Sequence, residues 1–370
     1  MFNALPPPLN FAVPFVIVLG VLVFFHELGH YLAARWRGVH VEAFSIGFGR
    51  AFATWTDRHG TVWKLAWIPL GGYVKLHGQE RPQDVGPEVR AQWQPGRTFQ
   101  EKGVGSRAIV VAAGPVANFV LAAALFALLF ATAGQPLIMP DVGEVLPGSA
   151  AARAGLAAGD RILAIDGQSV GTFEDIQRIV SARPDQTMTL QVRRGEQTQT
   201  LSLTTGVREQ SGRRIGSLGV TARTTEFRRL PPGRALVAGV AHTYDVAAVT
   251  LGGLWQMISS GRGTEDLGGP LRIAQLSGEV AQLGFASLID FIAVLSVNLG
   301  LINLFPIPIL DGGHLLFFLA EAARGRPLPP RAVEYGFRAG FALLVGLFVF
   351  ATWNDLSHLG LVRWVAHLIG

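Results

Sequence analysis

The sequence predicts an α-helical polytopic membrane protein with about four transmembrane helices, a membrane-associated β-hairpin or sheet, and one extracytoplasmic β-rich α+β domain. Of its 370 residues, 49% are hydrophobic and only 15% are charged, whereas soluble globular chains carry about 25% charged residues. Long apolar runs recur along the chain, and a polar stretch rich in strand-forming residues separates the second run from the third. This composition favours a membrane-embedded function, and nothing in it indicates nucleic-acid binding.

Four apolar runs supply the predicted helices. The first three approach the roughly 20 residues that a spanning helix needs, and the short fourth run is expected to be completed by the following segment NDLSHLGLV. The runs are Phe11–Ala34, Ala108–Ala133, Phe291–Leu310 and Gly340–Trp353. The N-terminus MFNALPPPLN has no basic residue, so a cleaved signal peptide is not expected. The chain has no cysteine, which excludes disulfides and thiolate metal sites.

Basic residues predict the orientation. No Lys or Arg precedes the first run, many lie between the first two runs, and Arg324, Arg326 and Arg331 precede the fourth. The positive-inside rule therefore places these two loops in the cytoplasm. Both chain ends and the stretch from about Gln135 to Leu288 are then expected outside.

The segment Ala235–Ile258 is apolar enough for a weak fifth span, but His242, Tyr244 and Asp245 lie near its centre. An interfacial or periplasmic helix is therefore expected there. The predicted division is 1–34, the first helix; 35–105, a cytoplasmic-side loop with the hairpin; 106–133, the second helix; 134–225, the outside domain; 226–287, a periplasmic or interfacial helical linker; 288–317, the third helix; 318–338, a cytoplasmic loop; and 339–370, the fourth helix with a C-terminal tail.

The first run ends in FFHELGHYLA, where His26, Glu27 and His30 form the pattern H-E-x-x-H. An ionised side chain at membrane depth costs roughly 2.5–3.5 kcal/mol, so such residues indicate function. On a helix the two histidines share one face and can bind one Zn²⁺, while the glutamate activates water as general base. The alternative is a chance match, which an apolar helix makes rarer.

A catalytic zinc usually has three protein ligands, so a third is expected elsewhere in the membrane. Asp311 in NLFPIPILDGGH is the candidate, because Pro306 and Pro308 cannot continue a regular helix. Broken backbone at membrane depth is tolerated only where it is buried in protein or lines a cavity. His314 is a lower-ranked rival, and the plain alternative is a helix end with Asp311 facing cytoplasmic water.

Asp311 ends the predicted third helix and can reach the histidines only if that helix runs in the same direction as the first. This requires an even number of crossings between Ala133 and Leu288, so a single span at Ala235–Ile258 would break the geometry.

In the second helix, GPVANF offers close backbone approach at Gly114 and a polar side chain four residues later at Asn118. Asn118 or Asn303 could stabilise a developing oxyanion or hold substrate. Alternatively, Asn118 is a packing contact with a satisfied amide.

The stretch Thr61–Leu76 has strand-forming residues interrupted by Pro69, Gly71 and Gly72, which predicts a membrane-associated hairpin. An exposed edge strand could take an unwound substrate by strand addition. The alternative is a hairpin that only packs against the helices.

HELGH, GPVANF and NLFPIPILDGG, in this order, resemble the site-2 protease family (M50) of intramembrane zinc metalloproteases, and within it the bacterial regulator-of-sigma-E protease group. The likeness extends over nearly the whole chain. It implies a zinc metalloendopeptidase with ligands His26, His30 and Asp311 and Glu27 as base. It further implies that Asn303, Pro306 and Pro308 shape the active site, that Asn118 handles substrate, and that one strand receives it: Gly71, Gly72, Tyr73, Val74, Lys75 and Leu76.

The stretch Val142–Val170 resembles the PDZ domains of bacterial proteases. FEDIQRIVSA is expected to be a helix, TMTLQVRRGEQTQTLSLTT a hairpin around Arg194–Gly195, and IGSLGV the closing segment. Such a domain either binds a peptide C-terminus or acts as a steric gate against bulky substrates, and both roles stay open. One copy is found here, whereas the enterobacterial relatives have two. The family's mode of substrate selection is therefore not carried over to this chain.

The resemblance implies cleavage of transmembrane segments of single-span proteins in the lipid bilayer of the bacterial inner membrane, near its cytoplasmic side, in regulated intramembrane proteolysis. Site-1-cleaved anti-sigma factors and remnant signal peptides are the family's substrate classes. The alternative is a PDZ-bearing membrane scaffold or a metal transporter without proteolysis. Glu27 beside both histidines disfavours this alternative and an inactive homologue, because neither has an evident use for a hydrolytic base.

Overall fold

The computed structural model describes residues 6, 9–80, 85–210, 213–260 and 268–358. The chain forms two compact units, one helical (Met1–Leu129 with Pro232–Gly370) and one β-rich (Phe130–Pro231). The predicted C-terminal tail and the end of NDLSHLGLV lie outside the described residues.

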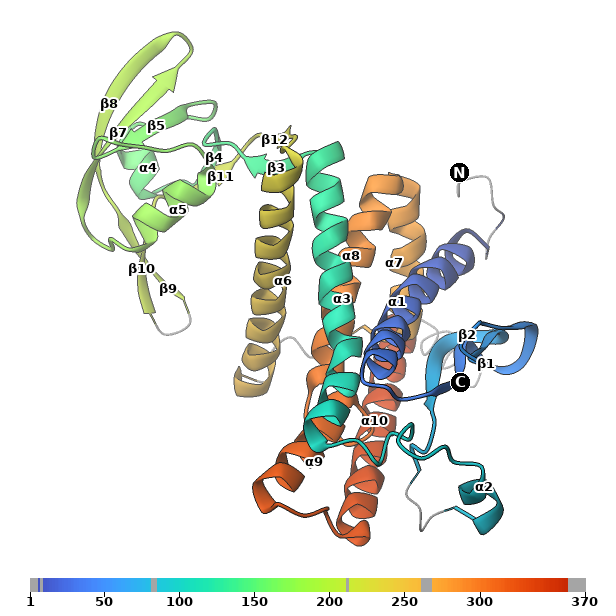
Figure 1. Cartoon of the computed structure of the whole chain (residues 1–370). Helices are drawn as coiled ribbons and strands as arrows, with labels where there is room; N and C mark the ends of the chain where they lie inside the picture. The colour runs from blue at the N-terminus through green and yellow to red at the C-terminus, as the bar shows by residue number, and fades with distance from the viewer. Residues whose placement is uncertain (1–5, 7–8, 81–84, 211–212, 261–267, 359–370) are drawn as a thin grey trace, which may run out of the picture. The chain divides into compact units, whose positions relative to one another are not determined.

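The helical unit is built around five long apolar helices (Figure 1). These are α1 (Leu9–Trp36), α3 (Val104–Thr132), α6 (Pro232–Ser260), α8 (Phe285–Leu304) and α10 (Pro330–His358). Three shorter helices accompany them: α2 (Pro87–Ala91), α7 (Pro270–Leu283) and α9 (Asp311–Arg324). Pro270 and Pro330 stand at the first position of α7 and α10, where a missing N–H leaves no helical hydrogen bond unmade.

All five long helices of the described residues are long and apolar enough to cross a membrane, one more than the four expected. The additional one is α6, the least apolar of the five, where three polar residues led us to expect an interfacial linker. The apolar residues on either side of His242, Tyr244 and Asp245 keep the mean hydropathy of α6 high enough for a membrane span. α6 does not connect directly to α8, because α7 lies between them in the chain and packs against α1 and α8.

Helices α1 and α8 run in the same direction. Asp311, which follows α8, can reach the histidines of α1 only in this arrangement. Val18 and Leu22 of α1 share one buried cluster with Leu288 and Ile292 of α8. Farther along both segments, His26 lies 3.3 Å from Asp311.

The third predicted helix is interrupted. α8 ends at Leu304, and Asp311 is the first residue of α9 and not the last residue of α8. Prolines at 306 and 308 explain the break, since each lacks an N–H and clashes with the preceding helical turn. Most of the predicted cytoplasmic loop 318–338 is also helical, because α9 extends to Arg324 and α10 begins at Pro330.

Strands β1 (Val41–Thr56) and β2 (Val62–Leu76) form a curled sheet of their own. Residues 43–46 of β1 match both 62–65 and 72–75 of β2, so this part of β1 lies between two arms of β2. The expected hairpin within Thr61–Leu76 is therefore wrong, because its arms flank β1 and do not pair with each other. Packing favours this arrangement, since Phe44 of β1 stacks on Trp63 at 4.3 Å. Within the described residues, 72–75 form an edge of this sheet.

The β-rich unit has its own buried core. A four-stranded sheet in the order β6-β5-β7-β8 is accompanied by the pairs β3–β12, β4–β11 and β9–β10. The strands are β3 (Gln135–Ile138), β4 (Val142–Val145), β5 (Arg161–Ile165), β6 (Gln168–Ser169), β7 (Thr187–Arg194), β8 (Gln197–Thr204), β9 (Gly206–Gln210), β10 (Arg213–Ser217), β11 (Val220–Ala222) and β12 (Thr225–Arg228), with helices α4 (Ala150–Arg153) and α5 (Phe173–Ser181). The predicted hairpin and the predicted helix are confirmed by β7–β8 and by α5, which Thr172 and Asp175 cap reciprocally.

A buried carboxylate paired with a partly exposed arginine makes the stability of this unit depend on pH. Asp160 is 1% exposed and accepts from Nε and Nη2 of Arg194, both at 2.7 Å, and from the N–H of Ala157. These bonds, Arg194 first, hold the pKa of the Asp160 carboxyl below its usual range. A lowered folded-state pKa stabilises the fold above the unfolded value of about 3.9, and this contribution is lost as the pH falls.

We therefore expect Asp160→Asn to lower the free energy of unfolding of a fragment spanning residues 130–231 by roughly 2 kcal/mol at pH 7. The difference from wild type should shrink as the pH falls below about 4, because the wild-type carboxyl is then protonated too. Denaturant titrations followed by circular dichroism measure this, with exposed Glu196→Gln as the control. An equal difference at pH 7 and pH 3 would contradict the account.

Candidate active site and metal centre

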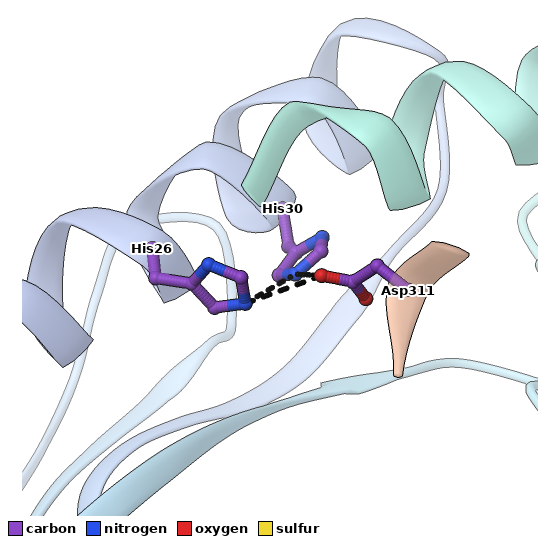
Figure 2. Close-up of side chains that lie close together, drawn as sticks. All are labelled: His26, His30 and Asp311. Carbon is purple, nitrogen blue, oxygen red and sulfur yellow. Dashed lines mark hydrogen bonds and ion pairs between the residues drawn. The ribbon is translucent and has the colours of Figure 1, made fainter. Parts of the chain in front are cut away.

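Two histidines of α1 and the first residue of α9 converge in the helical unit (Figure 2). The Nε2 atoms of His26 and His30 are 3.2 Å apart, and Oδ2 of Asp311 lies 3.3 Å from the first and 3.5 Å from the second. One ligand atom from each residue lies within 4.8 Å of the others, and within the described residues this is the group that could hold a metal ion. His314, the rival candidate, is not part of it.

The helical period explains the histidine pair, since residues four apart lie one above the other on the same face. Their side chains are 12% and 13% exposed, and that of Asp311 is 17% exposed. Asp311 is brought to them by the break between α8 and α9. As the first residue of α9 it also lies where the helix dipole favours a negative charge.

Hydrogen bonds orient each imidazole ring. Nδ1–H of His30 donates to the carbonyl of Val110 in α3 at 2.9 Å, which leaves the Nε2 lone pair facing Asp311. Nδ1 of His26 lies 3.1 Å from the side-chain amide of fully buried Asn118. The amide atom nearest the ring is Nδ2, and the buried Oδ1 of Asn118 has no partner. Turning the amide over lets Nδ1–H of His26 donate to Oδ1, which leaves the Nε2 lone pair of His26 for the centre.

The donor atoms of His26, His30 and Asp311 fit a zinc ion. Oδ2 of Asp311 is buried and makes no hydrogen bond, although the Nε2 atoms of both histidines lie near it. Three lone pairs that face one another in this way are expected where they share a cation. Gly114 leaves room for the rings, because a Cβ there would overlap Nε2 of His30 and lie 2.9 Å from Cε1 of His26. Two imidazole nitrogens and one carboxylate are a typical ligand set of catalytic zinc with one position open.

Glu27 lies beside the metal-binding group and against the edge arm of β2. A Cβ on Gly72 would be 3.1 Å from Cγ of Glu27 and 2.6 Å from the carbonyl of Ser45, so glycine lets the strand pass close to α1. The backbone N–H of Val74, two residues farther along the same strand, also lies near the Glu27 carboxylate. Glu27, the candidate base, is therefore in direct contact with residues 72–75, the candidate substrate-binding strand.

A cavity of about 1550 Å³ opens onto this group. Its wall includes the four residues of the predicted zinc site and five more predicted site residues: Asn303, Gly72, Tyr73, Val74 and Leu76. Asn118 contacts His26 from behind. Besides Asn118, four predicted residues are not part of the cavity wall: Gly71, Lys75, Pro306 and Pro308. Gly71, with a φ of 129°, bends the strand beside Phe48, and Lys75 pairs with Glu42 at 2.8 Å.

Sequence reasoning missed a buried ion pair in the cavity wall. Arg107 of α3 donates to Glu321 of α9 at 2.5 Å and packs over the ring of Phe318. Because the two residues are 214 positions apart, the pairing leaves no local signal in the sequence. It ties the helix that carries Asp311 to the helix that carries Gly114 and Asn118.

Comparison with known proteins identifies the family. The model of peptidase family M50 matches residues 14–347. A protein of Rhizobium meliloti is 43% identical over 372 residues, covering 95% of this chain and 98% of its own, and one of Agrobacterium fabrum is 44% identical over 363 residues, covering 95% and 96%. Both carry provisional names as zinc metalloproteases.

The regulator of sigma-E protease RseP of Salmonella typhimurium is 32% identical over 447 residues, covering 93% of this chain and 98% of its own. The crystal structure of a PDZ domain from an SdrC-like protein of Listeria monocytogenes matches 22% of this chain and 84% of its own at 20% identity, with a TM-score of 0.20. With the family model matched from residue 14 to residue 347, the chain belongs to peptidase family M50 and is a zinc metalloendopeptidase.

Proposed function

We propose that the protein hydrolyses peptide bonds within transmembrane segments of single-span membrane proteins, with zinc held by His26, His30 and Asp311. The observation that carries this proposal is the convergence of these three side chains beside Glu27 on a cavity that α1, α3, α9, α10 and the end of β2 help to line. Zinc in that position would supply Lewis-acid polarisation of the scissile carbonyl.

The residues of the chain divide the remaining work. Glu27 takes a proton from the attacking water and returns it to the leaving amine. Asn118 holds the His26 ring by its Nδ1 side, which makes it a positioning residue. Asn303 lies in the cavity wall, where its amide can donate to the developing oxyanion.

Substrate binding is assigned to the edge arm of β2. A transmembrane helix hides its peptide bonds in its own hydrogen bonds, so cleavage requires an extended segment. Residues 72–75 form a strand edge within the described residues, and Gly72 in this edge lies against Glu27. Strand addition along this edge would bring an extended substrate past the catalytic carboxylate.

The protein is a multi-pass protein of the bacterial inner membrane. We further propose that the catalytic group lies toward the cytoplasmic side, with the β-rich unit and both chain ends outside. The basic residues of the loops before α3 and before α10 support this orientation. If α6 crosses the membrane, the chain has to return between the end of α6 and the start of α8, since α8 runs parallel to α1.

The β-rich unit, which resembles a single PDZ domain, is proposed to select substrates. It does so either by binding a newly exposed peptide C-terminus or by excluding substrates with bulky outside domains. Anti-sigma factors already shortened by a site-1 protease and remnant signal peptides fit both modes.

Zinc removal tests the proposal. Purified protein in mild detergent should contain about one zinc per chain, cleave a panel of tagged single-span helices that lack outside domains, lose cleavage on chelation, and regain it when zinc is restored. Cleavage that survives complete zinc removal would refute the mechanism. Bound zinc with no cleavage of any helix in the panel would favour the scaffold or transporter alternative.

A further inference from the structure

The loop between α8 and α9 holds Asp311 through a strained backbone. Ile309, two residues before Asp311, has a φ of 105°, which a β-branched side chain rarely adopts. Two hydrogen bonds inside the loop, from Ile307 N–H to Phe305 and from Leu310 N–H to Ile307, shape it at 2.7 and 3.0 Å. Such strain persists only where surrounding structure over-determines the conformation.

The first turn of α9 is in direct backbone contact with this loop. A Cβ on Gly312 would overlap the carbonyls of Leu304 and Phe305, and a Cβ on Gly313 would overlap the carbonyl of Ile307 and lie 2.6 Å from Cα of Pro308. Any shift of Pro308 is therefore passed to the turn that carries Asp311.

Helix α10 presses on the other side of the loop. Gly340 is buried, and a Cβ there would overlap the carbonyl oxygen of Pro308 and lie 2.8 Å from its carbon. One turn earlier, a Cβ on Gly336 would lie 2.8 Å from Cζ of Phe317 and 3.6 Å from Cγ of Pro308. The pair has the G-x-x-x-G spacing that in apolar helices usually seats a second helix. Here that face of α10 packs against the loop between α8 and α9 of the same chain.

We propose that Gly340 is a positioning residue of the metal centre, which holds Pro308 so that Ile309 keeps its positive φ and Asp311 stays directed at the two histidines. The inference rests on the proposed ligand role of Asp311. It assigns α10, which contributes none of the three ligand atoms, a part in zinc affinity.

Three glycine-to-alanine changes in the one helix test this. Gly340→Ala adds a methyl against rigid backbone, Gly336→Ala adds one against a movable ring, and Gly346→Ala adds one where nothing lies within 4 Å. All three raise helix propensity equally, so helix stability does not separate them. Zinc affinity, measured by competition with a chromophoric chelator, should fall about 10- to 100-fold for Gly340→Ala, less for Gly336→Ala, and not at all for Gly346→Ala.

A double variant separates positioning from general damage. Glycine adopts positive φ freely, so Ile309→Gly should relieve the strain and restore part of the zinc affinity in the Gly340→Ala background. Equal affinity for Gly340→Ala and Gly346→Ala, or no recovery in the double variant, would overturn the inference. If Gly340→Ala is not recovered as folded protein, Gly336→Ala decides by the same comparison with Gly346→Ala. Wild-type protein that takes up no zinc would instead refute the proposed function.

Discussion

Glu27→Gln is expected to abolish peptide hydrolysis while leaving the zinc in place. The substitution keeps the size of the side chain and its packing against Gly72, but removes the carboxylate that accepts a proton from water. Positioned acid–base catalysis contributes about 10²–10⁴-fold, and the rate of cleavage should fall at least that far. The three proposed ligand atoms belong to other residues, so zinc per chain should be unchanged.

The measurement is cleavage of a tagged single-span helix by equal amounts of zinc-loaded protein, with metal content determined on the same samples. Glu174→Gln, an exposed position on α5 of the β-rich unit, is the matched control and should retain full activity. Wild-type cleavage by Glu27→Gln would remove Glu27 as the base. Loss of zinc in this variant would instead show that Glu27 supports the metal directly.

What the sequence could predict here depends on how local each interaction is. His26, Glu27 and His30 lie within one helical turn and a half, so the period of the helix alone places them on a common site. Asp311 is indicated by a local irregularity, since two prolines and an acidic residue interrupt an apolar run. The same prolines do not show that one helix ends and another begins, because the sequence indicates the break but not which side of it Asp311 joins.

Interactions across the chain could not be found in this way. The contact of Gly340 with Pro308 and the pair of Arg107 with Glu321 depend on how α10 and α9 pack, which no local pattern records. The curled sheet was missed for a related reason. A run of strand-forming residues bent by Pro69 and Gly71 predicts two arms, but its partner β1 had to be present to show that the arms lie on either side of it.

Gly114→Ala is expected to destroy the metal centre from a helix that supplies none of the three ligand atoms. Val110 and Gly114 are four residues apart on one face of α3, and both act on the same imidazole. The Val110 carbonyl fixes the His30 ring through Nδ1–H, and Gly114 leaves the space that the other edge of the ring occupies. An alanine methyl would overlap Nε2, and the ring cannot turn away without losing its bond to Val110.

Zinc affinity of Gly114→Ala should therefore fall at least about 100-fold, the upper end for changes that act on a ligand through its surroundings. Cleavage should fall with it. Gly105→Ala at the start of the same helix is the control, because a Cβ there meets nothing within 4 Å and both changes raise helix propensity alike. Chelator competition and gel filtration of both variants separate loss of metal from loss of fold. Equal zinc affinity for the two would mean that the His30 ring has a second position from which it still reaches the ion, and that the fixed ring orientation inferred here is not required for binding.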